Sequence, residues 1–369
     1  MLLTVSHNVK LLISSKYQYF LLLLYKQGYF RKEFYMASFS EDSRVKFPTI
    51  MHLMGMGYKY VSQKGLYSKY VNAPKTDYDS RTNILLPYFK EAYRRLNPDA
   101  AEDGAEKMLA RIQTVLSNDD LGRQFYKEVL LNTEERIIDL SSSFNFAHNN
   151  TFQVATEMAC GDKDGDNYRP DITLFVNGLP LAFIEVKKEN NHKGIQAETE
   201  RMKVRFQNPA FRRYLNITQI MVFSNDMEYD CNEVTPTIGA FYATIGKKDT
   251  KYNCFREDGQ DSFPVARNIV PVSESDEEIL LRDNNVPQYK NSSEYQTNCR
   301  ANTPTKRICD SLFSFERFWF LLKYGIAYVD YNNGLQKHIM RYPQIFATKA
   351  IEKFLDSGKR KGIIWHTQG

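Results

Sequence analysis

Residues 168–187 read YRPDITLFVNGLPLAFIEVK, and this stretch decides the fold. Two runs rich in β-branched and aromatic residues flank an Asn-Gly pair at positions 177–178. That arrangement is the sequence signal of a β-hairpin closed by a two-residue turn. The sequence therefore predicts two antiparallel strands joined at Asn177 and Gly178.

Charged side chains stand at the open end of this hairpin. Successive side chains of a strand point to opposite faces, so Glu185 and Lys187 should project to one side while Ile184 and Val186 enter a core. Folding at the turn should bring Asp171 back beside that strand end. We therefore expect two carboxylates and an amine to converge there.

These residue types suit metal-dependent phosphodiester chemistry. Asp171 and Glu185 would bind Mg²⁺, or Mn²⁺ in its place, through hard oxygen atoms, and the Val186 carbonyl would add another ligand. Lys187 would orient a water molecule or offset the charge that develops on the phosphate. Pro-Asp followed by Glu-x-Lys also occurs by chance in ordinary chains. The context favours a site, because a charge inside an apolar strand is costly unless it is used or paired.

The surrounding sequence predicts an α/β protein with a mixed sheet and flanking helices. Helical patterns dominate from Ser43 to Leu131, and a further helix is expected from Ile195 to Phe206. Besides the hairpin, the strands are expected at Glu135 to Asp139, Phe152 to Met158, Ile217 to Ser224 and Phe241 to Ile245.

The hairpin motifs, the strand Gln219 to Asn225, the segment Arg341 to Gln344 and the end Gly362 to Gly369 resemble the restriction (R) subunit of type I restriction-modification enzymes. The resemblance spans roughly Glu41 to Gly369. It implies a nuclease core of the Pro-Asp…(Asp/Glu)-x-Lys superfamily, followed by the start of a RecA-like, helicase-type motor.

The resemblance also implies roles. Asp171, Glu185 and Lys187 inherit the catalytic positions, with Mg²⁺ as cofactor and ATP used by the full-length protein for translocation. The implied partners are double-stranded DNA and the methyltransferase and specificity subunits of the same system. No membrane is implied, and the location is expected to be cytoplasmic.

Two features of the resemblance are incomplete in this chain. Many relatives carry a Gln-x-x-x-Tyr motif on the helix after the lysine, whereas residues 196–200 supply Gln196 without the tyrosine. Superfamily members also often add an acidic residue from an early helix. Glu41 and Asp42 are the candidates for it, with a helix-capping carboxylate as the structural alternative for either.

The carboxyl end resembles the entry to a nucleotide site. Gln344 is similar to the residue that reads adenine in such motors, with Arg341 beside it, and Thr367 and Gly369 begin the phosphate-binding loop. A surface role before a helix is the alternative for Arg341 and Gln344. The lysine of that loop is absent, so ATP hydrolysis by this polypeptide is not expected.

The net charge of the chain says little about its function. The 369 residues carry a formal net charge of +5, of which residues 1–35 supply most. DNA contact would therefore need a local basic patch. The candidates, for which a solvated helix face is the alternative, are Lys203, Arg205, Arg212 and Arg213.

Composition changes along the chain predict four parts. Residues 1–40 are expected to be an extension outside the fold, since Met36 is a plausible start and the apolar run 11–25 is too short and too interrupted to span a membrane. The other parts are a nuclease domain at 41–265, a polar linker or mobile loop at 266–310 and the beginning of a motor domain at 311–369.

Two functions remain open at this stage. The first is a Mg²⁺-dependent endonuclease that hydrolyses phosphodiester bonds of unmodified double-stranded DNA. The second is a non-catalytic DNA-binding and subunit-docking module with a vestigial nuclease site.

Overall fold

The computed structural model describes residues 3–4, 10–11, 40–62, 78–161, 167–188, 194–229, 238–246, 250–259, 262–265, 269–332 and 334–364. The chain divides into two units, Met1–Ser40 and Glu41–Gly369. In the first unit, β1 (Leu3–Thr4) pairs antiparallel with β2 (Lys10–Leu11). Met36 and the apolar run from residue 12 to residue 25 lie outside the described residues.

A nine-stranded mixed sheet forms the centre of the second unit, as far as the structure describes it. Its strands run in the order β14-β15-β12-β11-β10-β9-β6-β3, and β13 also pairs with β12. The pairs β10·β11 and β3·β6 are parallel, and the other pairs are antiparallel. The strands are β3 (Lys59–Tyr60), β6 (Phe152–Thr156), β9 (Ile172–Val176), β10 (Leu179–Val186), β11 (Ile220–Ser224), β12 (Ala240–Gly246), β13 (Thr250–Cys254), β14 (Ile326–Tyr331) and β15 (Gly334–Ile339).

The expected hairpin is confirmed as β9 and β10. Asn177 and Gly178 form its turn with φ angles of 52° and 76°. Both angles lie in the left-handed region, which a two-residue hairpin turn needs and which Asn and Gly tolerate best. The Asn177 side chain is also held, since its Nδ2 donates to the carbonyl of Ile137 at 3.0 Å.

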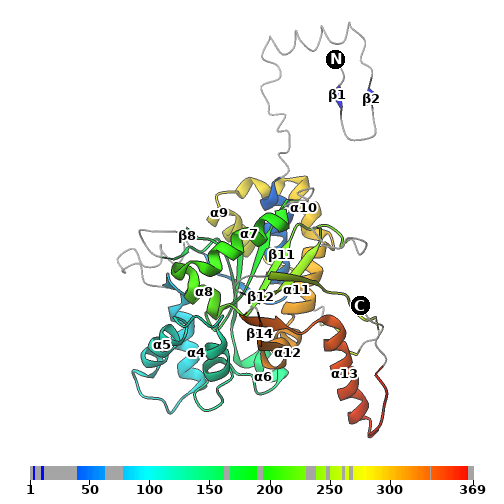
Figure 1. Cartoon of the computed structure of the whole chain (residues 1–369). Helices are drawn as coiled ribbons and strands as arrows, with labels where there is room; N and C mark the ends of the chain where they lie inside the picture. Colours follow the sequence, from blue (N-terminus) through cyan, green and yellow to red (C-terminus); the bar gives the residue numbers. More distant parts are fainter. Residues whose placement is uncertain are drawn as a thin grey trace. The chain divides into compact units, whose positions relative to one another are not determined.

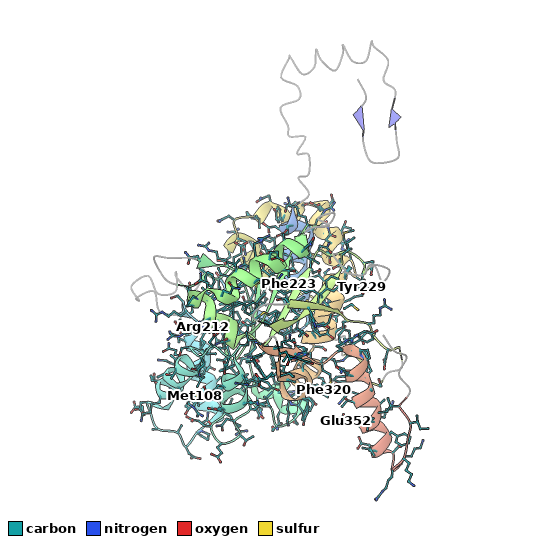
Figure 2. The ribbon with its side chains drawn as sticks, viewed as in Figure 1. Met108, Arg212, Phe223, Tyr229, Phe320 and Glu352 are labelled. Atoms are coloured by element: carbon teal, nitrogen blue, oxygen red, sulfur yellow. The ribbon has the colours of Figure 1, made fainter. Side chains whose placement is uncertain are left out.

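Alternation along the central strands builds two cores. Ile184 and Val222 belong to a large cluster on one face of the sheet. Phe183 and Phe223, one residue away in each strand, belong to a second cluster on the other face, together with Met202 of α7. Figure 1 shows α7 in front of the sheet, beside β11, with α8 below it to the left. Side chains fill the space between the layers, with Met108 and Phe320 of the large cluster labelled in Figure 2.

Helices cover both faces of this sheet. Those of the first half of the unit are the π-helix η1 (Asp42–Lys46), α2 (Phe47–Gly55), α4 (Leu86–Leu96), α5 (Gly104–Val115), the π-helix η2 (Phe125–Leu130) and α6 (Ser143–Asn149). Those of the second half are α7 (Gly194–Gln207), α8 (Arg212–Ile217), α9 (Glu274–Asp283), α10 (Ser293–Arg300), α11 (Pro304–Phe313), α12 (Phe315–Tyr324) and α13 (Tyr342–Asp356). Short pairs complete the unit: β4 (Tyr78–Asp79) with β5 (Ile84–Leu85), and β7 (Cys160–Gly161) with β8 (Asn167–Tyr168).

The prediction of a polar linker or mobile loop at 266–310 is wrong for residues 274–310. Helices α9, α10 and α11 occupy most of this segment and bury Leu280, Leu281 and Tyr295 against the large cluster. Its serines cap helices, because Oγ of Ser273 accepts from the amide of Asp276 at 3.2 Å. Cap residues and exposed helix faces produced the polar composition that resembled a linker.

The predicted division between 41–265 and 311–369 is not the division in the structure. Strand β15 joins the same sheet through β12, with Ile245 opposite Lys337. Residues 41–369 therefore form one unit. Residues 362–364 form no helix or strand, and residues 365–369 lie outside the described part.

The predicted strand Glu135 to Asp139 is also absent from the described structure. Side-chain amides replace strand partners there, because the backbone N–H of Arg136 donates to Asn97 and that of Asp139 donates to Asn150, each at 2.9 Å. Among the described helices, none is both long enough and apolar enough for a bilayer crossing.

Candidate functional site

Three charged residues meet at the ends of neighbouring strands. Asp171 immediately precedes β9, and Glu185 and Lys187 lie at the end of β10. Ile172 and Ile184 are opposite each other in the antiparallel pair, so Asp171 comes beside the end of β10. Its Oδ2 accepts a hydrogen bond of 2.8 Å from the backbone N–H of Val186.

The ammonium group of Lys187 is the centre of the cluster. Its Nζ lies 3.5 Å from Oδ2 of Asp171 and 3.7 Å from Oε2 of Glu185. It donates to the carbonyl oxygen of Val186 at 2.7 Å. The backbone N–H of Lys187 donates to the carbonyl of Ser224 on the parallel strand β11 at 2.7 Å, which fixes the strand end. The structure thus brings together Asp171, Glu185, Val186 and Lys187, the four residues that the sequence predicts at this strand end.

Helix α7 adds two charged residues that the sequence analysis did not assign to the site. Oε2 of Glu198 lies 3.7 Å from Nζ of Lys187. Arg205 Nη1 lies 2.5 Å from Oε1 of Glu198 and 3.9 Å from Oε1 of Glu185. The sequence contains one signal for Glu198. It follows Ile195 by three positions, so the two side chains share a helix face, and this face of α7 is buried.

Tyr168 closes the cluster from the strand side. Its hydroxyl donates to Oε1 of Glu185 at 2.5 Å. The guanidinium carbon of Arg205 lies 4.0 Å from the centre of the Tyr168 ring, a cation–π contact. Tyr168 therefore links the α7 arginine to the β10 carboxylate.

Burial and charge shift the acid–base properties of this cluster. Burial raises the pKa of Glu185 well above its ordinary value, and the nearby Asp171 and Glu198 carboxylates raise it further. Burial lowers the pKa of the Lys187 ammonium, but Asp171, Glu185 and Glu198 more than offset this, so its pKa is raised. Lys187 is therefore charged at neutral pH.

The early helix contributes Glu41 to the surroundings of the site. Burial raises the pKa of Glu41, which also feels the charges of Lys187 and Asp171. Asp42 instead lies 2.6 Å from Nζ of Lys46. Of the two candidates that the sequence left open, Glu41 is the one whose charge interacts with the cluster.

Gln196 does not join these contacts. It is exposed on α7, and we find no hydrogen bond between its side chain and the cluster among the described residues. Among the residues considered for a basic DNA patch, Arg205 is taken up by the cluster. Lys203 lies 2.7 Å from Glu200, and Arg212 lies 3.9 Å from Asp119.

The oxygen atoms of the cluster fit a small hard cation. Asp171, Glu185 and the Val186 carbonyl surround one positive charge, the Lys187 ammonium, and carboxylate and carbonyl oxygens are the ligands that Mg²⁺ prefers. No group of three or more His, Cys, Asp or Glu side chains has a metal-holding arrangement in the described part of the chain. A metal here would thus depend on two carboxylates, a carbonyl and water.

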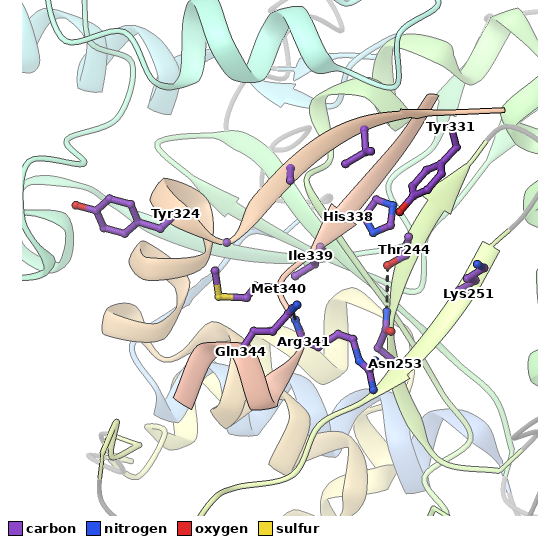
Figure 3. A pocket seen from close by; sticks show the side chains of 13 residues that line it. Thr244, Lys251, Asn253, Tyr324, Tyr331, His338, Ile339, Met340, Arg341 and Gln344 are labelled. Carbon is purple, nitrogen blue, oxygen red and sulfur yellow. Dashed lines mark hydrogen bonds between the residues drawn. The ribbon is translucent and has the colours of Figure 1, made fainter. Parts of the chain in front are cut away.

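A separate cavity of about 540 Å³ lies between the sheet and the start of α13. Arg341 and Gln344 line it, and Figure 3 shows their side chains on the α13 side with Asn253 and Thr244 across from them. Oε1 of Gln344 accepts from the backbone N–H of Arg341 at 2.9 Å, which caps the helix. Thr367 and Gly369, the other two residues expected at a nucleotide site, lie outside the described residues.

A mixed α/β fold with acidic and basic side chains gathered at its strand ends is consistent with the nuclease-like class of proteins. Comparison with protein families identifies the group: residues 38–235 match the family "Type I restriction enzyme R protein N terminus". The chain belongs to this family, the amino-terminal region of type I restriction enzyme R subunits.

Individual relatives agree with this assignment. The chain is 26% identical over 359 residues to the MjaIXP type I restriction enzyme endonuclease subunit of Methanocaldococcus jannaschii, covering 90% of this chain and 30% of that protein. It is 26% identical over 155 residues to the HindI endonuclease subunit of Haemophilus influenzae, covering 38% of this chain and 14% of that protein. The chain thus spans less than a third of the length of these relatives.

Proposed function

We propose that this region is the Mg²⁺-dependent nuclease part of a type I restriction enzyme. It would hydrolyse phosphodiester bonds of unmodified double-stranded DNA, working with methyltransferase and specificity subunits in the cytoplasm. One observation carries the proposal: Asp171, Glu185 and Lys187 meet at one strand end. There Nζ of Lys187 lies 3.5 Å from Oδ2 of Asp171 and 3.7 Å from Oε2 of Glu185. Membership in the R-subunit family supports it.

Each residue has a distinct task in this proposal. Asp171, Glu185 and the Val186 carbonyl would hold Mg²⁺, which supplies Lewis-acid polarisation of the phosphate and a more acidic water molecule when bound. Lys187, with a raised pKa, stays protonated and can orient the attacking water or stabilise the extra negative charge on the phosphate. Tyr168 fixes the orientation of Glu185 through its hydrogen bond.

A metal titration tests this proposal. The chain should bind Mn²⁺, detected by electron paramagnetic resonance, and Asp171→Asn should weaken that binding at least tenfold, an order-of-magnitude estimate. Asp330→Asn is the matched control, because that carboxylate is 75% exposed and pairs with Arg123 away from the cluster. Binding that is unchanged in Asp171→Asn would refute the metal assignment.

Cleavage by the reconstituted complex tests the catalytic roles. Asp171→Ala and Lys187→Ala should each abolish DNA cleavage while circular dichroism shows a folded protein. Retained cutting by either folded variant would contradict the proposal. The alternative, a DNA-binding and docking module with a vestigial nuclease site, predicts assembly with the partner subunits and no Mn²⁺ binding that depends on Asp171.

The cavity beside α13 supports a second part of the proposal, coupling to ATP in the longer protein. We infer that Arg341 and Gln344 face the base of an adenine nucleotide there. The cavity volume of about 540 Å³ is in the range of small-molecule sites. Its lining combines the rings of Tyr331 and His338 with the basic groups of Lys251 and Arg341, which suits an aromatic anion.

A further inference from the structure

Glu198 is a buried carboxylate that no sequence motif singled out as a site residue. Its side chain is 1% exposed, although a charge in that position is costly without partners. Three cations lie near it: Arg205 at 2.5 Å, Arg201 at 3.3 Å and Lys187 at 3.7 Å. A carboxylate held by three cations is fixed in place.

The two oxygen atoms of Glu198 have different surroundings. Oε1 is held by Arg205, whose guanidinium is in turn fixed over the ring of Tyr168. Oε2 is buried and accepts no hydrogen bond from the described residues. Two cations lie near this oxygen without a hydrogen bond to it, Nη1 of Arg201 at 3.3 Å and the Lys187 ammonium at 3.7 Å. A small movement of the flexible Lys187 side chain would complete a hydrogen bond.

The Lys187 ammonium also contacts the oxygens that we assign to the metal. It donates to the Val186 carbonyl at 2.7 Å and lies 3.5 Å from Asp171 and 3.7 Å from Glu185. A divalent cation bound to these oxygens would lie close to the ammonium, and two cations repel each other strongly in a buried site. Lys187 and a divalent cation therefore compete for the same oxygen atoms, and the ammonium needs another acceptor nearby.

We propose that Glu198 is a positioning residue, which draws the Lys187 ammonium away from the metal-binding oxygens and holds it at the edge of the site. The inference rests on the proposed function, since it concerns the lysine and the metal site of that nuclease. It assigns to Glu198 the contribution from the helix that the sequence analysis gave to Gln196.

A double-mutant cycle on Mn²⁺ affinity tests this role. Glu198→Gln should weaken Mn²⁺ binding by about tenfold, as substitution of a residue that orients a metal site does. In a Lys187→Met background no ammonium competes, so the same substitution should weaken binding several-fold less than in the wild-type background, because only the loss of the Glu198 charge remains. Lys187→Gln replaces the methionine variant if that variant does not fold. Glu200→Gln is the matched control, because Glu200 lies on the same helix, is 67% exposed and pairs with Lys203.

Each outcome decides the matter. An equal loss of affinity in both backgrounds would mean that Glu198 acts directly on the metal, and no loss in either background would mean that it does not act on the site; both results overturn the proposal. A second measurement needs no metal. In EDTA, the changes in melting temperature caused by Glu198→Gln and Lys187→Met should not add in the double variant, because the two groups interact.

Additive changes in melting temperature would overturn the inference. If the wild-type chain binds no Mn²⁺ while the melting temperatures are non-additive, the metal-dependent function fails and the pairing of Glu198 with Lys187 stands. The two failures are therefore distinguishable.

Discussion

The hydroxyl group of Tyr168 donates a 2.5 Å hydrogen bond to Oε1 of Glu185, and both side chains are buried. The bond crosses from β8 to β10 and brings the tyrosine ring against Arg205. The carboxylate of Glu185, which we propose to be catalytic, is thus oriented by Tyr168. This tyrosine lies in the stretch 168–187, but strand periodicity alone did not assign it to the site.

Tyr168→Phe should lower the free energy of unfolding by about 1–3 kcal/mol, because it leaves a buried carboxylate oxygen without its donor. The loss is measured by urea denaturation. Mn²⁺ affinity should fall as well, since Glu185 loses its fixed orientation. A Tyr168→Phe variant with unchanged stability and unchanged Mn²⁺ affinity would show that the hydroxyl has no part in the site.

Gly178→Ala should destabilise the hairpin by at least about 2 kcal/mol, since a close backbone contact adds to the strain of a left-handed residue. An added Cβ would come 2.6 Å from the carbonyl oxygen of Leu85. Gly259→Ala is the control, because φ there is also positive at 67° and nothing lies within 4 Å of the added atom. Chemical denaturation of both variants should give a larger loss at Gly178, and equal losses would rule out the clash.

The buried Lys337 should make the free energy of unfolding depend on pH. Its Nζ is buried and donates to the Thr218 carbonyl at 2.6 Å, and burial lowers its pKa from 10.5 to about 7. Between these two values the unfolded chain binds more protons than the folded chain, so the free energy of unfolding should rise with pH across that window and be independent of this group below it.

The rise attributable to Lys337 should be on the order of 4 kcal/mol between pH 7 and pH 10. Lys337→Met removes the titrating group and should flatten this part of the curve, which urea denaturation at several pH values can measure. A variant whose stability follows the same pH curve as the wild type would show that Lys337 does not titrate in this window.

The cavity beside α13 should bind a fluorescent adenine nucleotide weakly. Arg341→Ala should reduce that binding several-fold, because it removes a cation from the lining of the pocket. Arg360→Ala is the control, since that exposed arginine is not among the lining residues. Equal affinities of the two variants in a fluorescence titration would contradict the nucleotide assignment.

Local features of the sequence determined the hairpin and the residues at its end. The Asn-Gly pair, the alternation through Phe183 and Ile184, and the position of Glu185 two residues before Lys187 depend only on neighbouring residues and on the strand period. The helix expected at Ile195 to Phe206 likewise formed as α7, with one further residue at each end. In these segments local propensity and tertiary packing agree.

Only the tertiary structure decided which distant residues join the cluster and that residues 41–369 form one unit. Glu198 rather than Gln196 reaches Lys187 because the packing of Ile195 and Met202 sets the rotation of α7, which a charged residue does not reveal by itself. The serines of 273–292 cap packed helices, and β15 pairs with β12 across some ninety residues of sequence. Such contacts depend on long-range packing: the helical spacing of Ile195, Glu198 and Met202 indicates a shared helix face, but local sequence does not say what that face packs against.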